Sequence, residues 1–239
     1  MRDKIRDEEY FLRYIEHISN RIEEVRKALN KHLLEKGEDV LGVTTCRGTL
    51  ADLYLIKVEA LFSVGKPVQE IKKIIPDMID CYVKSRSEYG AHDELLSMIS
   101  IPIMLGVSKE NIKKLTELMP KIKTRDYLVD FLLHGLDPKW KIENVKMKIP
   151  KPYLYLQDVI NAENKETAQM LLEDFVEKRW YKGSRAYVWY NSHKNTKRDA
   201  YSGYWCFVAG AVAKLLELDD SSLKDCQYYP YDMVHFEDN

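Results

Sequence analysis

The chain has 239 residues, and its 37 basic and 38 acidic side chains leave a formal net charge of −1. This balance excludes a protein that binds nucleic acid through its overall positive charge, and it excludes an acidic disordered chain. Ten glycines and eight prolines are few for this length, which disfavours an all-β protein with many tight turns. The sequence contains no apolar run of about 18 residues, and its N-terminus is charged where a secretory signal would be apolar. We therefore expect a helical protein of the cytoplasm.

The first half of the chain is predicted to form helices joined by short turns. Residues 7–36 carry apolar side chains at steps of three and four, which is typical of one amphipathic helix, and Gly37 is expected to end it. Pro76 is expected to kink one of the later helices, and Ser108 is expected to cap another. These later helices are expected over residues 50–64, 67–89, 93–105 and 108–119.

The second half is predicted to contain further helices around one irregular connection. Residues 136–152 hold three prolines, and a brief extended piece is expected within them at residues 145–149. The helices are expected over residues 126–133, 153–162, 165–180 and 202–218, with Asn164 as a cap. The expected fold is all-α, with antiparallel helical hairpins in two packed lobes. We expect an N-terminal domain of residues 1–124 and a C-terminal domain of residues 125–239.

No motif of a catalytic, cofactor or metal site is found. The six histidines are scattered, and no nucleotide-binding or nucleophile motif occurs. The four cysteines form no C-x-x-C pair, so we expect reduced thiols packed in a cytosolic protein. We therefore expect no catalytic residues, no metal and no cofactor.

Residues 178–198 combine seven basic residues with five aromatic ones and no acid, whereas residues 199–239 hold eight acids against two lysines. Basic residues interleaved with aromatic ones are typical of single-stranded nucleic-acid binding, which is one alternative function. The favoured interpretation is that the two segments face and neutralise each other with the aromatic side chains in the core. A helical scaffold protein is a second alternative.

Residues 203–232 read GYWCFVAGAVAKLLELDDSSLKDCQYYPYD, and this pattern resembles the C-terminal domain of the PoNi immunity proteins. The early stretch RDKIRDEEYFLRYIEHISNRIEEVRKAL is similar to the N-terminal domain of the same family. Val208 departs from the family pattern, because family members commonly carry glutamate there. The residues that carry the C-terminal resemblance are Gly203, Tyr204, Trp205, Phe207, Tyr228, Tyr229 and Pro230.

The resemblance implies an all-α, two-domain protein that binds and neutralises a cognate DNA-degrading polymorphic toxin used in bacterial competition. It implies a cytoplasmic binding protein without enzymatic activity, whose partner is the nuclease toxin domain rather than a membrane or nucleic acid. A nuclease presents a basic DNA cleft, so acidic clusters are the expected contacts. Asp219 and Asp220 also suit a cap of a short helical turn. The candidate toxin-binding residues are Glu88, Asp93, Glu94, Asp219, Asp220, Asp225 and Asp232.

Overall fold

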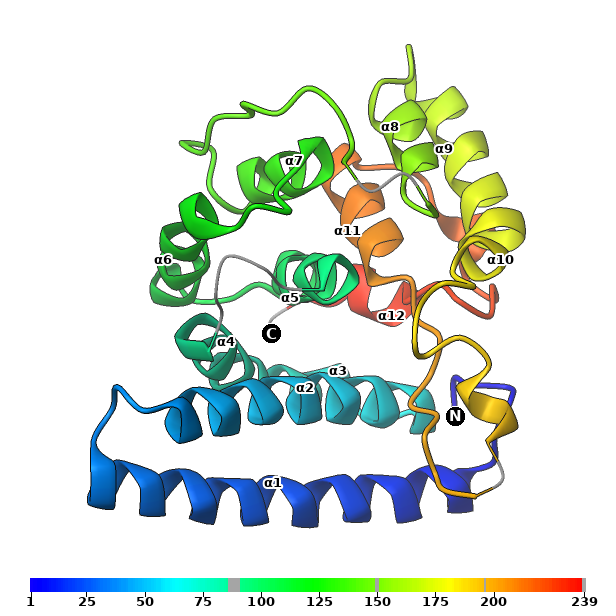
Figure 1. Cartoon of the computed structure of the whole chain (residues 1–239). Coiled ribbons are helices and arrows are strands. Elements are labelled where there is room, and N and C mark those ends of the chain that lie inside the picture. The colour runs from blue at the N-terminus through cyan, green and yellow to red at the C-terminus, as the bar shows by residue number, and fades with distance from the viewer. Residues whose placement is uncertain (86–90, 149–150, 196, 238–239) are drawn as a thin grey trace. The chain divides into compact units, whose positions relative to one another are not determined.

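Figure 1 shows the computed structural model of the chain, which describes residues 1–85, 91–148, 151–195 and 197–237. All regular structure within these residues is helical, and the predicted all-α class is confirmed. Two compact units are present, and each is built from separate stretches of sequence. Unit 1 comprises Met1–Ser87, Lys113–Leu118 and Asn191–Gly203, and unit 2 comprises Glu88–Ile112, Met119–Tyr190 and Tyr204–Asn239. The division at residue 124 stays a prediction.

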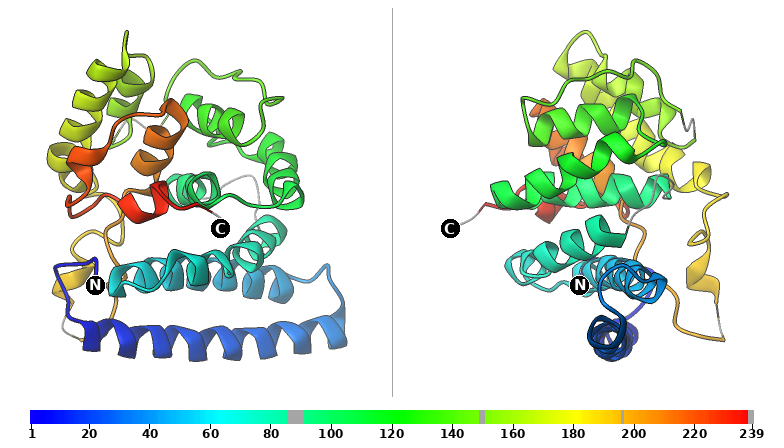
Figure 2. Two further views of the ribbon diagram at one scale, coloured as in Figure 1. Left: turned by 180° about the vertical axis from the view of Figure 1, so that it is seen from behind. Right: turned by 60° about the vertical axis from the view of Figure 1, so that its left-hand side comes forward.

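Unit 1 is organised around the antiparallel hairpin of α1 (Glu8–Lys36) and α2 (Leu41–Val64), which lie side by side in Figures 1 and 2. The Asp7 side chain caps α1 by accepting the N–H of Tyr10 at 2.9 Å, and Gly37 ends it with a φ of 78°. The predicted apolar stripe of α1 is confirmed in its first half. Its buried members are Phe11, Tyr14, Ile18 and Ile22, and the neighbouring Tyr10 is buried as well.

The structure corrects two predicted helices of unit 1. α2 begins nine residues before the expected residue 50, because its early turns pack against α1: a Cβ on Gly42 would lie 3.1 Å from the His32 imidazole. The expected helix over residues 67–89 is divided into α3 (Val68–Lys72) and α4 (Ile75–Ser85). Pro76 lies in the first turn of α4, where its missing N–H costs nothing, so it marks a helix start instead of a kink. Residues 86–89 lie outside the described residues.

A segment from late in the sequence completes unit 1. The backbone N–H of Tyr201 donates to the Tyr10 hydroxyl at 2.9 Å, and that hydroxyl donates to the Tyr201 carbonyl at 3.1 Å. The Tyr201 hydroxyl also donates to the buried carboxylate of Asp3. The expected start of the last long helix at Ser202 is therefore wrong. Residues 201–206 have no regular secondary structure and precede α11, which begins at Phe207.

The remaining helices follow the predicted order. Ser108 and Asn164 are confirmed as caps, since each side chain accepts a backbone N–H three residues later. A π-helix over Phe175–Trp180 continues α9 into α10. The bounds are α5 His92–Leu105, α6 Lys109–Leu118, α7 Tyr127–Leu136, α8 Leu154–Ile160, α9 Lys165–Asp174, α10 Tyr181–Gly183, α11 Phe207–Leu216 and α12 Tyr231–Val234. No helix in the described ranges has the length and apolar character needed to cross a membrane.

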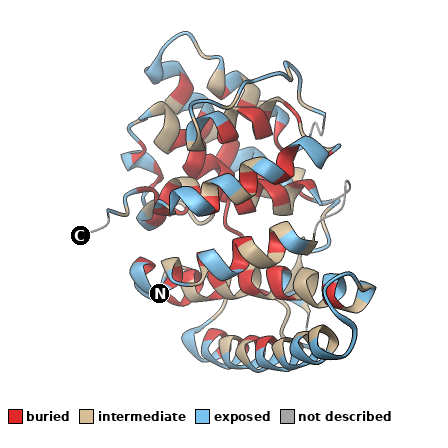
Figure 3. Cartoon of the chain, turned by 90° about the vertical axis from the view of Figure 1, so that its left-hand side faces the viewer, coloured by how far each residue is buried: buried red, intermediate tan, exposed pale blue. Residues whose placement is uncertain are grey.

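The core of unit 2 forms where α11 packs against α5. Gly210 permits this close approach, because a Cβ there would lie 2.7 Å from the sulfur of Met104. The Lys214 ammonium donates to the Met104 carbonyl at 2.7 Å and to the Val234 carbonyl at 2.9 Å, so it joins the C-terminal ends of α5 and α12. Figure 3 shows the buried residues on the inward faces of the helices and the exposed ones outside.

Candidate functional site

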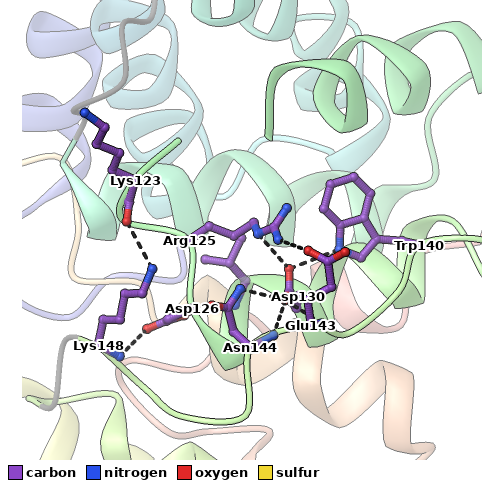
Figure 4. A network of polar contacts seen from close by, with 9 residues as sticks. Lys123, Arg125, Asp126, Asp130, Trp140, Glu143, Asn144 and Lys148 are labelled. Atoms are coloured by element: carbon purple, nitrogen blue, oxygen red, sulfur yellow. Dashed lines mark hydrogen bonds and ion pairs between the residues drawn. The ribbon is translucent and has the colours of Figure 1, made fainter. Parts of the chain in front are cut away.

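The most elaborate polar network of unit 2 attaches an irregular loop, residues 137–148, to α7 (Figure 4). Its centre is the carboxylate of Asp130, which is 0% exposed. One oxygen accepts the Trp140 indole N–H at 3.1 Å, and the other accepts the backbone N–H groups of Glu143 at 3.0 Å and Asn144 at 2.9 Å. The Asn144 amide adds a further hydrogen bond at 2.9 Å. These hydrogen bonds compensate for the hydration that the Asp130 carboxylate loses on burial.

Arg125 neutralises this buried carboxylate and also covers the loop. Its Nε lies 3.2 Å from Asp130, and its terminal nitrogen donates to the Glu143 carboxylate at 2.5 Å. The guanidinium carbon lies 5.3 Å from the centre of the Trp140 ring. The charge of this arginine is therefore used inside the network, by two carboxylates and by the Trp140 ring.

A second buried carboxylate, Asp126, holds the other end of the loop. It caps α7 by accepting the N–H of Val129 at 3.2 Å, and it accepts the N–H of Lys148 at 3.1 Å. The imidazole of His92 lies 3.3 Å away. Burial acts to raise the pKa of Asp126, but His92 and the two backbone N–H groups outweigh it, so this pKa lies below its usual value.

The expected extended piece at residues 145–149 is wrong for its described part. Residues 145–148 form no strand, because their backbone groups bond to α7 instead of to a neighbouring strand: the Lys146 carbonyl accepts the N–H of Tyr127 at 3.2 Å. Residue 149 lies outside the described residues. None of residues 137–148 is buried, and Ile142 and Val145 are 41% and 74% exposed. The loop therefore presents a fixed surface containing apolar side chains.

The aromatic residues of segment 178–198 pack on one another in unit 2, where Trp180 is buried and the other four are half-buried. Tyr181 stacks on Tyr228 with centroids 5.3 Å apart and contacts Tyr204 at 4.9 Å. The cluster consists of Tyr153, Trp180, Tyr181, Tyr187, Trp189, Tyr190, Tyr204 and Tyr228. Rings packed on one another do not form the stacking platform that single-stranded nucleic acid requires.

The basic residues at the start of this segment are neutralised differently from the expectation. The Lys178 ammonium lies 3.2 Å from the Asp174 carboxylate, and Arg179 pairs with the same carboxylate. Asp174 belongs to α9, whereas the expected partners were acids near the C-terminus. Both cations are therefore paired with a carboxylate four or five residues earlier in the chain. Their charges are not neutralised by the C-terminal acids.

The structure removes Asp220 from the candidate contact surface. Its side chain is only 2% exposed, and its carboxylate accepts the Tyr229 hydroxyl at 2.5 Å. The half-exposed His235 places Nε2 2.7 Å from the same carboxylate. Asp220 thus links the turn at Ser221–Leu223 with the region of α12, and its charge faces the interior.

The other candidate acids differ in their exposure. Asp93 is partly buried and accepts the Trp189 indole N–H at 3.1 Å; burial raises its pKa. Glu94 is half-buried, and Glu88 lies outside the described residues. Among the candidate acids that the structure describes, the three that are exposed at the surface of unit 2 are Asp219, Asp225 and Asp232. These three are the candidates that can meet a partner without first being uncovered.

The residues of the C-terminal signature are mainly packing residues. Tyr204, Trp205 and Phe207 are 3%, 7% and 2% exposed, so their predicted burial is confirmed. Tyr229 and Pro230 are buried as well, and Gly203 adopts a φ of 131° that favours glycine. Val208 is 4% exposed. A glutamate in its place would be buried, and it would need a hydrogen-bonding partner.

Reactive and metal-binding groups are sparse in the described ranges. They contain no group of three or more His, Cys, Asp or Glu side chains arranged to hold a metal ion. All four cysteines are free thiols, and burial raises the pKa of Cys81 to about 11. Two surface features of unit 2, the fixed loop and the exposed acids, are suited to contact with another molecule.

Two family profiles match consecutive parts of the chain. The profile described as PoNe immunity protein (PoNi), N-terminal, matches residues 2–117, and the one described as PoNe immunity proteins (PoNi), C-terminal, matches residues 124–233. No curated protein sequence gives a significant match. The crystal structure of protein PA2201 from Pseudomonas aeruginosa is similar with a TM-score of 0.65, at 14% identity over 91% of this chain and 86% of that chain. At this identity the similarity concerns the fold alone.

Proposed function

Because the chain belongs to the PoNe immunity protein (PoNi) family, we propose that it binds and neutralises one cognate toxin, a DNA-degrading nuclease, in the cytoplasm of the producing cell. Proteins of this family are immunity proteins, which bind a toxin and are not enzymes. The observation that carries the proposal is the pair of family matches, which together extend over residues 2–117 and 124–233. Because a DNA-degrading toxin acts on DNA in the cytoplasm, we expect the immunity protein to bind the toxin in that compartment.

The exposed acids of unit 2 support an electrostatic mode of binding. Residues 217–237 hold six acids and one lysine. Among these acids, Asp219 accepts the backbone N–H of Ser221 at 3.1 Å, and the hydrogen bonds from Ser221 lower the pKa of Asp219. Its carboxylate is therefore charged at neutral pH. Together with Asp225 and Asp232, it is suited to steer association with a basic DNA cleft and to cover that cleft.

Binding and inhibition are tested with the purified cognate toxin domain, which we expect a neighbouring open reading frame to encode. We expect the two proteins to co-purify and DNA cleavage to stop near a one-to-one ratio. The immunity protein alone is expected to leave DNA, RNA and peptide intact with or without magnesium or zinc. Turnover by the isolated chain that one point mutation abolishes would refute the proposal.

The acidic surface is tested by charge reversal of Asp219, Asp225 and Asp232 to lysine. Each variant is expected to weaken toxin affinity, with the larger loss at low salt, because surface charges act mainly on the association rate. Glu16→Lys, at an exposed position of α1, is the matched control and should leave affinity unchanged. If all three reversals retain the wild-type affinity and salt dependence while the fold survives, the acidic contact surface is wrong.

A further inference from the structure

Unit 2 uses two fully buried carboxylates to hold a loop that adds nothing to its core. Asp126 and Asp130 are both 0% exposed, and between them they accept hydrogen bonds from the middle of residues 137–148, at Trp140, Glu143 and Asn144, and from its last residue, Lys148 (Figure 4). Burying a carboxylate is costly unless hydrogen bonds compensate for the lost hydration. Here that compensation orders a segment in which no residue is buried. Long loops without secondary structure in a compact unit are usually functional.

The side chains that this anchored loop, residues 137–148, directs to solvent are of two kinds. Ile142 and Val145 are apolar and 41% and 74% exposed. The loop also holds four lysines against two acids, and one of these acids, Glu143, is already paired with Arg125. Lys139, Lys141 and Lys146 are exposed, and in the described ranges their ammonium groups lie in no ion pair. The anchored loop therefore combines positive charge with exposed apolar surface.

We propose that the anchored loop is a second docking surface for the toxin, and that it binds an acidic patch with an apolar centre outside the DNA cleft. This inference rests on the proposed function. The anchored loop is positively charged, whereas the acids at residues 219–232 are negatively charged, so the two surfaces suit different regions of one partner. Because the loop is ordered before binding, association does not incur the full entropy cost of fixing a flexible segment. Ile142 and Val145 supply the desolvated centre, and the lysines supply the polar rim.

The loop geometry favours a protein partner over nucleic acid. Trp140 is its only aromatic residue; the indole N–H is bonded to Asp130 and the ring is covered by Arg125. Single-stranded nucleic acid needs free aromatic faces, and duplex binding needs cations rather than exposed isoleucine and valine. An acidic protein surface satisfies the lysines and covers both apolar side chains.

The test measures the affinity of two loop variants for the same purified toxin domain. One variant carries Ile142→Asp with Val145→Asp, and the other carries Lys141→Glu with Lys146→Glu. Two matched controls lie elsewhere in unit 2: Val188→Asp at a valine that is 102% exposed, and Lys182→Glu at an exposed lysine. Thermal melting confirms the fold of each variant, and Ile142→Ser replaces Ile142→Asp if the first variant does not fold.

We expect each loop variant to weaken binding at least tenfold and both controls to stay within about twofold. The lysine variant should also show a smaller salt dependence than the wild type. Folded loop variants that bind within twofold of the wild type would overturn the inference. If the lysine variant no longer binds DNA in a retention assay that the wild type passes, while its toxin affinity is unchanged, the inference would be overturned as well. A wild-type chain that does not bind the toxin domain would instead overturn the proposed function.

Discussion

The indole N–H of Trp140 donates to the buried carboxylate of Asp130 at 3.1 Å, across ten residues of sequence. The helix α7 thus carries the acceptor, and the loop that follows the helix carries the donor. Asp130 lies on the inward side of an apolar helix, where an unpaired carboxylate would be strongly destabilising. The donors of the loop compensate for the burial of the Asp130 carboxylate. The hydrogen bond between Trp140 and Asp130 thus links the core of unit 2 to its candidate docking surface.

Replacing Asp130 with alanine should therefore release the anchored loop and destabilise the fold. The change leaves the Trp140 indole and two backbone N–H groups without their acceptor and removes one of the two carboxylates paired with Arg125, so we expect a loss of about 3–5 kcal/mol in unfolding free energy. Limited trypsin digestion should cut the variant at the loop lysines before the rest of the chain. Asp158→Ala, at an exposed position of α8, serves as control and should change stability by less than about 0.5 kcal/mol. Equal stability and equal protection of both variants would contradict the anchoring role.

Asp126 should make the fold sensitive to acid. Its pKa in the folded chain lies below the unfolded value of about 3.9, so its contribution is complete above that pH and is lost as pH falls through the folded pKa. The wild type should consequently lose thermal stability more steeply than Asp126→Asn below about pH 4, although the variant is less stable at pH 7. Melting temperatures between pH 7 and pH 2 provide the measurement. If the melting temperatures of the wild type and the variant fall in parallel with pH, the protonation of Asp126 does not contribute to the pH dependence of stability.

Asp93 should have the opposite pH dependence. Burial raises its folded pKa above the unfolded value of about 3.9, so stability falls as pH rises from that value through the folded pKa. Asp93→Asn keeps an acceptor for the Trp189 indole and removes the poorly hydrated charge. We expect the variant to melt a few degrees higher at pH 7, since about 1 kcal/mol corresponds to roughly 2–4 °C in a protein of this size. The difference should disappear at low pH, and a variant that melts lower at pH 7 would contradict the argument.

Trp205 should be among the most sensitive packing positions. It is 7% exposed and precedes α11, whose residues 207–213 are all buried. Trp205→Ala should cost roughly 3–5 kcal/mol in denaturant unfolding, because a large buried side chain leaves a cavity. Leu34→Ala, at a leucine that is 88% exposed, is the control and should be nearly neutral. A Trp205 variant that unfolds like the wild type would show that the side chain is not part of the core.

The two halves matched by the family profiles should not fold separately. Unit 1 includes Asn191–Gly203 from the C-terminal half, and unit 2 includes α5 from the N-terminal half. Fragments 1–122 and 123–239 expressed alone should therefore lack cooperative melting transitions, since each exposes apolar surface that the other fragment covers. Co-expression should yield a complex with a single cooperative transition. A separately expressed fragment with native-like melting would support an independent domain.

The helices with complete local signals were predictable from sequence, and those that depend on packing were not. α1 has a cap, an apolar stripe and a terminal glycine within its own 29 residues, and its bounds agree with the prediction. The early turns of α2 contain glycines and threonines with weak helix propensity, and packing against α1 stabilises them. The late start of α11 has a similar cause, because residues 201–206 form backbone hydrogen bonds to distant partners such as Tyr10 and Tyr228.

The sequence by itself determined the all-α class, the order of the helices and the resemblance to the PoNi family, because helix periodicity and caps act over a few residues. Only the tertiary structure decided which charges face solvent. Asp219 and Asp220 are adjacent in sequence, yet Asp219 is exposed, whereas Asp220 is buried and contacts the Tyr229 hydroxyl and the His235 imidazole. The anchored loop likewise gains its shape from Asp126 and Asp130, which bond to loop residues 10 to 22 positions away. Burial and hydrogen bonding between separated segments depend on how the chain packs, and no local pattern encodes them.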